Sequence, residues 1–167
     1  MTNAGTPDVS EQRRKSEPPL EPKFEIRDSV PADAASLVKL IALLDHSVDA
    51  VGVGQRLATL SKSGEAPIVV TIGGVIAGLC AMHRMIVVHR SAPVGRITIL
   101  VVAEAARGKG CGRMLIEEAE TRLRARGCGL VEVTSNDRLI RAHAFYRHLG
   151  YERTSMRFAK ALRLERS

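Results

Sequence analysis

An apolar run, a glycine-rich turn and an amphipathic stretch follow one another between residues 97 and 126, and this succession constrains the fold more than any other part of the chain. Residues 97–103 (ITILVVA) are apolar and rich in β-branched side chains, which predicts a buried strand. In the turn, residues 107–112 (RGKGCG), every second residue is glycine. The apolar residues that follow at helical spacing predict a helix that ends before Gly127. They are Leu115, Ile116, Ala119 and Leu123.

A strand, a glycine turn and a helix in this order form a binding site for an anion. The first N–H groups of a helix have no acceptor within it, and the helix dipole adds partial positive charge there. Glycine lets a phosphate approach the backbone without meeting a Cβ. Arg107, Lys109 and Arg113 add full positive charges. The stretch therefore predicts a ligand that carries phosphate, such as a diphosphate.

The spacing of the glycines distinguishes between the known phosphate-binding motifs. A P-loop requires Ser or Thr after a Gly-Lys pair, but Lys109 is followed by Gly110. The dinucleotide fingerprint G-x-G-x-x-G fails because Arg113 stands at its third glycine. The pattern that fits is R-x-x-G-x-G, from Arg107 to Gly112. Taken alone, an ordinary glycine turn before a surface helix remains the alternative interpretation.

Charge is distributed unevenly along the chain. The net charge is +7. Residues 24–80 hold four basic and six acidic groups, a net of −2, whereas residues 81–167 hold seventeen basic and eight acidic groups, a net of +9. A nucleic acid is one possible partner for the basic half, but the sequence has no recognition-helix signature and no aromatic stacking platform. We therefore expect a polyanionic cofactor and no nucleic acid, with a solvated basic face as the simplest alternative.

Composition and the ends of the chain indicate a single domain in a reducing compartment. Residues 1–23 combine prolines with charged and polar residues and predict a disordered tail, which leaves residues 24–167 as the domain. No apolar run approaches the ~20 residues of a membrane helix, and the N-terminus is polar, so we expect a cytoplasmic protein without a membrane partner. Cys80, Cys111 and Cys128 show no metal-binding spacing, and we expect no metal. Each cysteine is expected to be a small packing residue, with an exposed and oxidisable thiol as the alternative for Cys111 in the glycine turn.

The remaining periodicities predict an α+β fold, with a mixed, mostly antiparallel sheet flanked by helices. The expected order is β-α-α-β-β-β-α-β-α-β. Besides the strand at 97–103, strands are expected at residues 24–27, 68–72, 75–88, 130–134 and 154–158. Besides the helix that ends before Gly127, helices are expected from Pro31 to about Leu44, at 47–63 and at 139–149. On the helix before Gly127, Glu118–Arg122 and Glu120–Arg124 are spaced as i,i+4 ion pairs.

A second motif lies on the last predicted helix and the two residues after it. From Ala142 to Tyr151 the chain reads A-x-x-F-Y-x-x-x-G-Y, preceded by Asn136 at the end of a strand. Together with the R-x-x-G-x-G turn, in this order and spacing, it resembles the GNAT superfamily of acetyl-CoA-dependent N-acetyltransferases. The resemblance covers about residues 24–160 and is nearest to small prokaryotic-type single-domain acetyltransferases that act on small amines, including aminophosphonate-like relatives.

The resemblance implies a seat for acetyl-CoA as the acetyl donor. In the family the central strand diverges from the next one, and the pantetheine arm lies in the gap, here against Leu100, Val101 and Val102. The pyrophosphate is implied to lie on the glycine turn, formed by Arg107, Gly108, Lys109, Gly110, Cys111, Gly112 and Arg113. Asn136 is implied to hydrogen-bond the pantetheine arm. Tyr146 is implied to stabilise or protonate the leaving thiolate, and packing of a half-buried helical Tyr is the alternative.

The general base is where the chain departs from the family. Many relatives place Glu on the central strand where this chain has Thr98, which cannot act as a base. Substitutes are His83, Glu104, His89 or an ordered water chain. His83, on the long strand of residues 75–88, is the best placed of these, although a lone strand histidine is more often structural.

Two functions follow from the resemblance. The first is an N-acetyltransferase in which a primary amine of a small molecule or peptide attacks acetyl-CoA directly in a ternary complex. The second is a non-catalytic acyl-CoA-binding regulatory protein, which the missing Glu favours. A homodimer is common among such proteins. A nucleotide-binding loop is a weaker third interpretation.

Overall fold

The computed structural model describes residues 23–162 and shows a five-stranded sheet in which strand order follows sequence order. The first four strands pair antiparallel, and the fifth pairs parallel with the fourth. The predicted mixed, mostly antiparallel sheet is thus confirmed. The strands are β1 (Phe24–Asp28), β2 (Ile68–Ile72), β3 (Val75–Met85), β4 (Val94–Val102) and β5 (Leu130–Val133).

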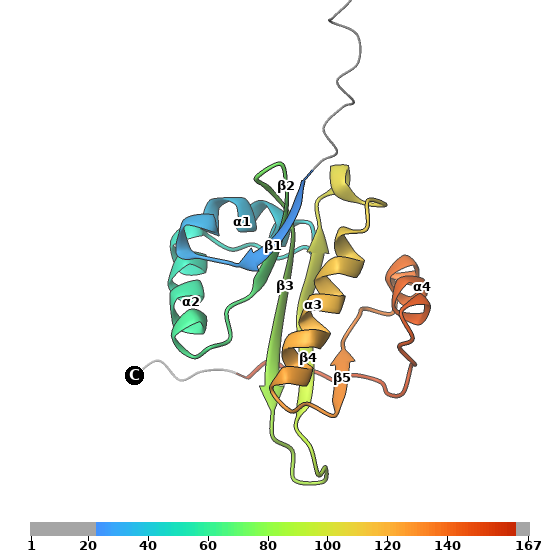
Figure 1. Ribbon diagram of the computed structural model, residues 1–167. Helices are drawn as coiled ribbons and strands as arrows, with labels where there is room; N and C mark the ends of the chain where they lie inside the picture. Colours follow the sequence, from blue (N-terminus) through green and yellow to red (C-terminus); the bar gives the residue numbers. More distant parts are fainter. Residues whose placement is uncertain (1–22, 163–167) are drawn as a thin grey trace, which may run out of the picture.

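Helices cover both faces of the sheet (Figure 1). Helices α1 (Ala34–Ala42) and α2 (Ala50–Lys62) pack on one face, and α3 (Cys111–Ala125) lies across β3 and β4 on the other. Helix α4 (Ile140–His148) follows β5. Two short 3-10 turns, η2 (Pro31–Asp33) and η3 (Glu104–Ala106), precede α1 and α3.

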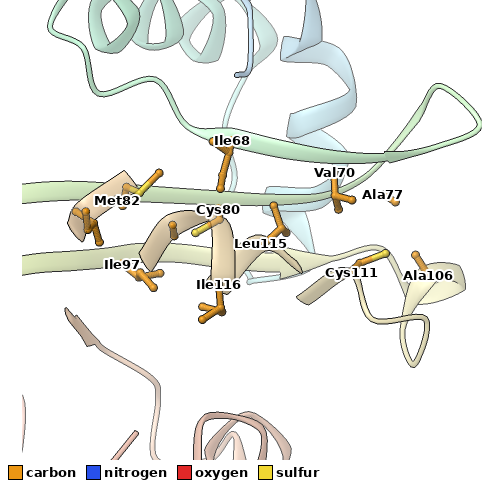
Figure 2. Close-up of a cluster of buried hydrophobic side chains, with 12 residues drawn as sticks. Ile68, Val70, Ala77, Cys80, Met82, Ile97, Ala106, Cys111, Leu115 and Ile116 are labelled. Carbon is orange, nitrogen blue, oxygen red and sulfur yellow. The ribbon is translucent and has the colours of Figure 1, made fainter. Parts of the chain in front are cut away.

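Strand alternation divides the core into two layers. On β2, Ile68 and Val70 face α3, while Val69 between them faces α1 and α2. The predicted apolar stripe of α3 is confirmed, because all four of its residues are buried against the sheet. Figure 2 shows Leu115 and Ile116 of this stripe among side chains of the strands. Gly95 on β4 allows α3 to pack close to the sheet, because a Cβ at this position would lie only 2.5 Å from Leu123 Cδ1.

The predicted strand at residues 154–158 does not form. Residues 151–162 adopt no regular secondary structure, and Met156 and Phe158 are exposed. A β-like composition becomes a strand only where a neighbouring strand accepts its backbone hydrogen bonds. The structure shows no such pairing for this segment among the described residues. The predicted tail, residues 1–23, lies outside the described residues except for Lys23.

We predict that Ile116→Ala lowers the free energy of unfolding by about 2–5 kcal/mol, because it leaves a cavity under α3. Ile116 is 1% exposed. Urea denaturation monitored by circular dichroism measures the change. Ile86→Ala is the matched control, since Ile86 is 81% exposed and should change stability by no more than about 0.5 kcal/mol. Equal losses in the two variants would contradict this account of the core.

Candidate functional site

The loop between β4 and α3 holds its glycines in a conformation that other residues avoid. Gly108 has φ +77° and Gly110 has φ +84°, both in the left-handed region. A Cβ at either position would meet nothing within 4 Å. The backbone conformation, and not crowding, therefore requires glycine here. The open space beside the loop leaves room for a ligand to approach the main chain.

Helix α3 begins with N–H groups that have no acceptor. Its first backbone hydrogen bond runs from the Met114 N–H to the Gly110 carbonyl, at 3.0 Å. The preceding N–H groups, those of Cys111, Gly112 and Arg113, donate to no acceptor within residues 23–162. Gly110 is the N-cap and has no side chain that could accept from them. These donors and the helix dipole together form a site for an anion.

The basic side chains of the loop are at the surface. Arg107 lies 3.5 Å from Glu104, and Arg113 lies 3.1 Å from Glu117, with all four side chains more than half exposed. Exposed pairs of this kind contribute little, so either arginine can turn to a phosphate at small cost. Lys109 is exposed as well.

Strands β4 and β5 separate beside this loop. They pair only from Val94–Leu130 to Ile97–Val133, whereas β4 continues to Val102. The separation begins at a β-bulge on β4. The register passes from Ile97 opposite Met82 to Ile99 opposite Ala81, which leaves Thr98 as the extra residue. Beyond Thr98, β4 pairs with β3 alone and its other edge is open.

Backbone alternation decides which residues face the open edge. The Ala103 N–H donates to the Ala77 carbonyl on β3 at 2.8 Å. The Val101 carbonyl also faces β3, because it lies 3.1 Å from where a Cβ of Gly78 would be. Since consecutive strand residues point their backbone groups to opposite sides, Leu100 and Val102 turn theirs to the open edge.

This alternation corrects one part of the implied cofactor seat. The Val101 backbone faces β3, and its side chain is buried against α1 and α2. Of the three residues proposed for the pantetheine arm, only Leu100 and Val102 offer hydrogen-bonding groups to the open edge.

Helix α4 joins the second motif to the first. The Phe145 ring packs on the start of α3, with its Cζ 3.3 Å from where a Cβ of Gly112 would lie. Tyr146 makes edge-to-face contacts with Phe145 and Tyr151, at centroid distances of 5.3 and 5.8 Å. The Tyr151 hydroxyl donates to Glu120 on α3 at 2.8 Å. The aromatic residues of the motif thus fix α4 against α3.

Tyr146 packs against the same core cluster as the buried face of α3. Burial, with a smaller contribution from nearby Cys80, raises the pKa of Tyr146 to about 12. Its hydroxyl therefore remains protonated at neutral pH and can act as a hydrogen-bond donor.

The residues after β5 carry polar groups next to the separation. Asn136 is exposed, and its Oδ1 accepts from the Arg138 N–H at 3.0 Å, which leaves its Nδ2 as a donor. The Ser135 hydroxyl is buried and has no hydrogen-bond partner within the described chain.

Among the residues considered as a base, the structure gives a distinct setting only to His83. Glu104 and His89 are exposed, and the Thr98 hydroxyl donates to the Ala81 carbonyl at 3.3 Å. His83 Nδ1 lies 2.8 Å from Glu65 Oε2. No sequence pattern indicates this contact, because Glu65 lies in the connection before β2, 18 residues from His83, and no motif marks it.

The cysteines are packing residues, as expected, and the alternative of an exposed Cys111 is wrong. Cys111 is 1% exposed and points into the core with Ala106 (Figure 2). As the first residue of α3 it turns its side chain to the sheet, and burial raises its pKa. Burial also raises the pKa of Cys80 to about 12. Both thiols are thus protonated and shielded.

Two further findings concern residues 23–162. No group of His, Cys, Asp and Glu side chains in this range could hold a metal ion. No helix in the range is long and apolar enough to span a membrane.

Comparison with known proteins identifies the class. Residues 39–151 match the model of the acetyltransferase (GNAT) family, and the chain belongs to this family. It is 33% identical over 89 residues to an aminoalkylphosphonate N-acetyltransferase of Salmonella typhimurium, which covers 53% of this chain. The match spans 58% of that relative's length.

Solved structures share the fold. A transcriptional regulator from Bacillus halodurans matches with a TM-score of 0.77 at 21% identity, covering 84% of this chain and 100% of its own. An aminoglycoside N-acetyltransferase in complex with CoA matches with a TM-score of 0.76 at 16% identity, covering 87% and 99%. At these identities the likeness establishes the fold alone.

We predict that Gly110→Ala destabilises the protein by about 1–2 kcal/mol, the cost of a left-handed conformation for a residue with a Cβ. Gly54→Ala in α2 is the control, because the added Cβ would make only ordinary contacts, at 3.7 Å or more. That variant should be neutral or gain up to about 1 kcal/mol. Urea denaturation of both variants measures the difference. A Gly110→Ala variant as stable as the parent would contradict the strained loop.

Alkaline pH should destabilise the protein through its tyrosines. The chain has two, and burial raises the pKa of both Tyr146 and Tyr151 above the unfolded value of about 10. A pKa raised on folding contributes stability that is complete below pH 10 and is lost as pH rises toward 12.

Absorbance at 295 nm measures this effect. At pH 11 the folded protein should show little tyrosinate, and guanidinium should release most of the signal. In Tyr146→Phe the remaining tyrosine is Tyr151, so the absorbance lost relative to the parent belongs to Tyr146. Titration of the folded chain near pH 10, as in the denatured chain, would contradict burial of the two hydroxyls.

Proposed function

We propose that the protein is an N-acetyltransferase that transfers the acetyl group of acetyl-CoA to a primary amine of a small molecule or peptide, by direct attack in a ternary complex. One observation carries the proposal: the open edge of β4 leads to the N–H groups at the start of α3 that find no acceptor within residues 23–162. An extended ligand with an anionic end fits this arrangement. The match to an aminoalkylphosphonate N-acetyltransferase supports a small amine as the acceptor.

The residues of the site fit acetyl-CoA as the acetyl donor. The N–H groups of residues 111–113 and the side chains of Arg107, Lys109 and Arg113 would hold the pyrophosphate. The backbone groups of Leu100 and Val102 would pair with the pantetheine arm, with Asn136 Nδ2 as a further donor across the opening. When bound, acetyl-CoA supplies an activated acetyl thioester.

Two groups of the chain would stabilise the charge that develops during transfer. The Val102 N–H faces the open edge, where it can donate to the acyl carbonyl oxygen as that atom becomes negative. The Tyr146 hydroxyl would donate to the departing sulfur. With a Tyr146 pKa of about 12, full proton transfer to a thiolate of pKa ~8.5 would be uphill by roughly 5 kcal/mol. Tyr146 thus stabilises the thiolate without protonating it, and we assign removal of the amine proton to His83.

Thermal denaturation with acetyl-CoA, ATP and NAD in parallel tests the cofactor. At ~100-fold excess over Kd, acetyl-CoA should add about 2.7 kcal/mol of stability, seen as a rise in Tm. ATP and NAD should add little. Gly110→Asp, which places a negative charge on the loop, should abolish the rise, and Gly54→Ala should keep it. Absence of any rise with acetyl-CoA would refute the proposed function.

Release of CoA across a panel of amines, with an aminoalkylphosphonate included, tests the reaction. Tyr146→Phe should lower kcat by roughly 10²–10³-fold, the effect of removing one donor to developing charge, and should leave acetyl-CoA binding unchanged. Binding without turnover on any amine would instead favour a non-catalytic acyl-CoA-binding regulator. The observation behind that second function is Thr98, which stands at the bulge of β4, at the position where the resemblance implies Glu in many relatives.

A further inference from the structure

His83 has a carboxylate partner that determines which of its ring nitrogens carries a proton. The Glu65 side chain accepts hydrogen bonds at both oxygens, with Oε2 at 2.8 Å from His83 Nδ1 and Oε1 at 3.3 Å from the Arg84 backbone N–H. The His83 hydrogen bond, chiefly, lowers the pKa of Glu65. An ionised carboxylate can only accept, so Nδ1 must donate. In neutral His83, Nε2 therefore holds the free lone pair.

Glu65 is itself held in place. Arg126, beyond the end of α3, lies 3.4 Å from its Oε1, and the Arg84 Nε donates to the Arg126 carbonyl at 3.1 Å. The Glu65 side chain is 22% exposed and that of His83 is 36% exposed. The carboxylate is thus anchored from two elements, while the imidazole remains accessible to a small molecule.

The sheet register places His83 close to the point where β4 and β5 separate. His83 pairs with Arg96, which directly precedes Ile97, the last residue of β4 that pairs with β5. The register position of His83 is two residues from the bulge at Thr98, or about 7 Å along the strand.

His83 lies on the face of the sheet that α3 does not cover. Met82 and Ile97 pack in the cluster beneath α3, and the alternation of side chains turns His83 and Arg96 to the opposite face. Tyr146 packs with the α3 cluster. An acyl group held at the separation would therefore have Tyr146 on one side and His83 on the other, so an amine that enters opposite Tyr146 meets the imidazole.

We propose that Glu65 is the positioning residue of a Glu65–His83 pair that accepts the proton of the acceptor amine through His83 Nε2. This inference rests on the proposed acetyl transfer. The amine lone pair forms the C–N bond to the acyl carbon, and the C–S bond breaks with its electron pair left on sulfur. The amine proton passes to Nε2, and the adjacent Glu65 carboxylate stabilises the imidazolium that results. Solvent removes that proton before the next cycle.

Two of the three arginines near His83 in the described chain are paired with carboxylates, and the third, Arg84, donates to the Arg126 carbonyl. Arg96, opposite His83 on β4, donates from Nε to Glu132 on β5 at 2.7 Å, and Arg126 is paired with Glu65. Because each of these cations has a carboxylate partner, neither stands as an isolated positive charge beside the imidazole. Glu65 is the acidic group in direct contact with the ring.

Nitrogen NMR of histidine-labelled protein tests the positioning role without knowledge of the acceptor. The chain has five histidines, and His83→Gln assigns the His83 signals. Neutral His83 should be the Nδ1–H tautomer in the parent and in Glu65→Gln, whose amide oxygen still accepts. Glu65→Ala should shift His83 toward the Nε2–H tautomer. An Nε2–H tautomer in the parent would overturn the proposal, because Nε2 would then have no lone pair.

Steady-state CoA release tests the catalytic role. His83→Gln should lower kcat by roughly 10²–10⁴-fold, the usual contribution of a general base, with KM for acetyl-CoA unchanged. Glu65→Gln should lower kcat less. It should also move the acid limb of the kcat/KM profile to lower pH, because the imidazolium loses its carboxylate. The assay should use a weakly basic amine as the acceptor. Such an amine is already neutral over this pH range, so its own protonation does not contribute to the profile.

Glu118→Gln is the matched control for the loss of a carboxylate as such. Glu118 is partly exposed, like Glu65, but it pairs with Arg122 on α3 at 2.7 Å, so kcat and the acid limb should stay those of the parent. An acid limb that does not move in Glu65→Gln would overturn the positioning role. Turnover unaffected by His83→Gln would overturn the proton-acceptor role alone, whereas no CoA release from any amine overturns that role together with the proposed function.

Discussion

The unequal hydrogen bonding of β4 is the constraint on which the rest of the structure depends. On one side β4 pairs with β3 along its length, and on the other it pairs with β5 only as far as Ile97. The second pairing stops just before the bulge at Thr98, and beyond it the backbone groups of Leu100 and Val102 face an opening. Backbone donors and acceptors removed from water require partners, so the strand that organises the core also exposes the groups a ligand would bind.

Packing of α3 brings the second part of the site to this opening. Its buried stripe fixes the helix across β3 and β4, so that its N-terminus and the loop before it lie beside the end of β4. The Phe145 ring then rests on Gly112, which carries α4 and Tyr146 to the same core cluster. The two motifs, thirty residues apart, are one packed unit because each supplies the contact surface of the other.

The two faces of the sheet divide the proposed chemistry. The α3 face holds Tyr146 and the anion-binding loop, and the opposite face holds His83 with Glu65. Strand alternation produces this division, since neighbouring residues of β3 point to opposite sides. A thioester between β4 and β5 would be accessible to a donor for sulfur on one side and to a proton acceptor for the amine on the other.

The sequence by itself determined the features that depend on local spacing, and only the tertiary structure decided those that depend on pairing between distant segments. The strand, glycine loop and α3, its buried stripe and the Glu118–Arg122 pair follow from periods of two and 3.6 residues. The predicted Glu120–Arg124 pair is replaced by the Tyr151 hydroxyl on Glu120, and residues 154–158 find no strand partner. Three further features likewise depend on register and packing. They are the inward turn of Cys111, the direction of the Val101 backbone and the Glu65–His83 contact. Local periodicity carries no information about register between strands, because it is the assembled sheet that sets which residues stand opposite one another.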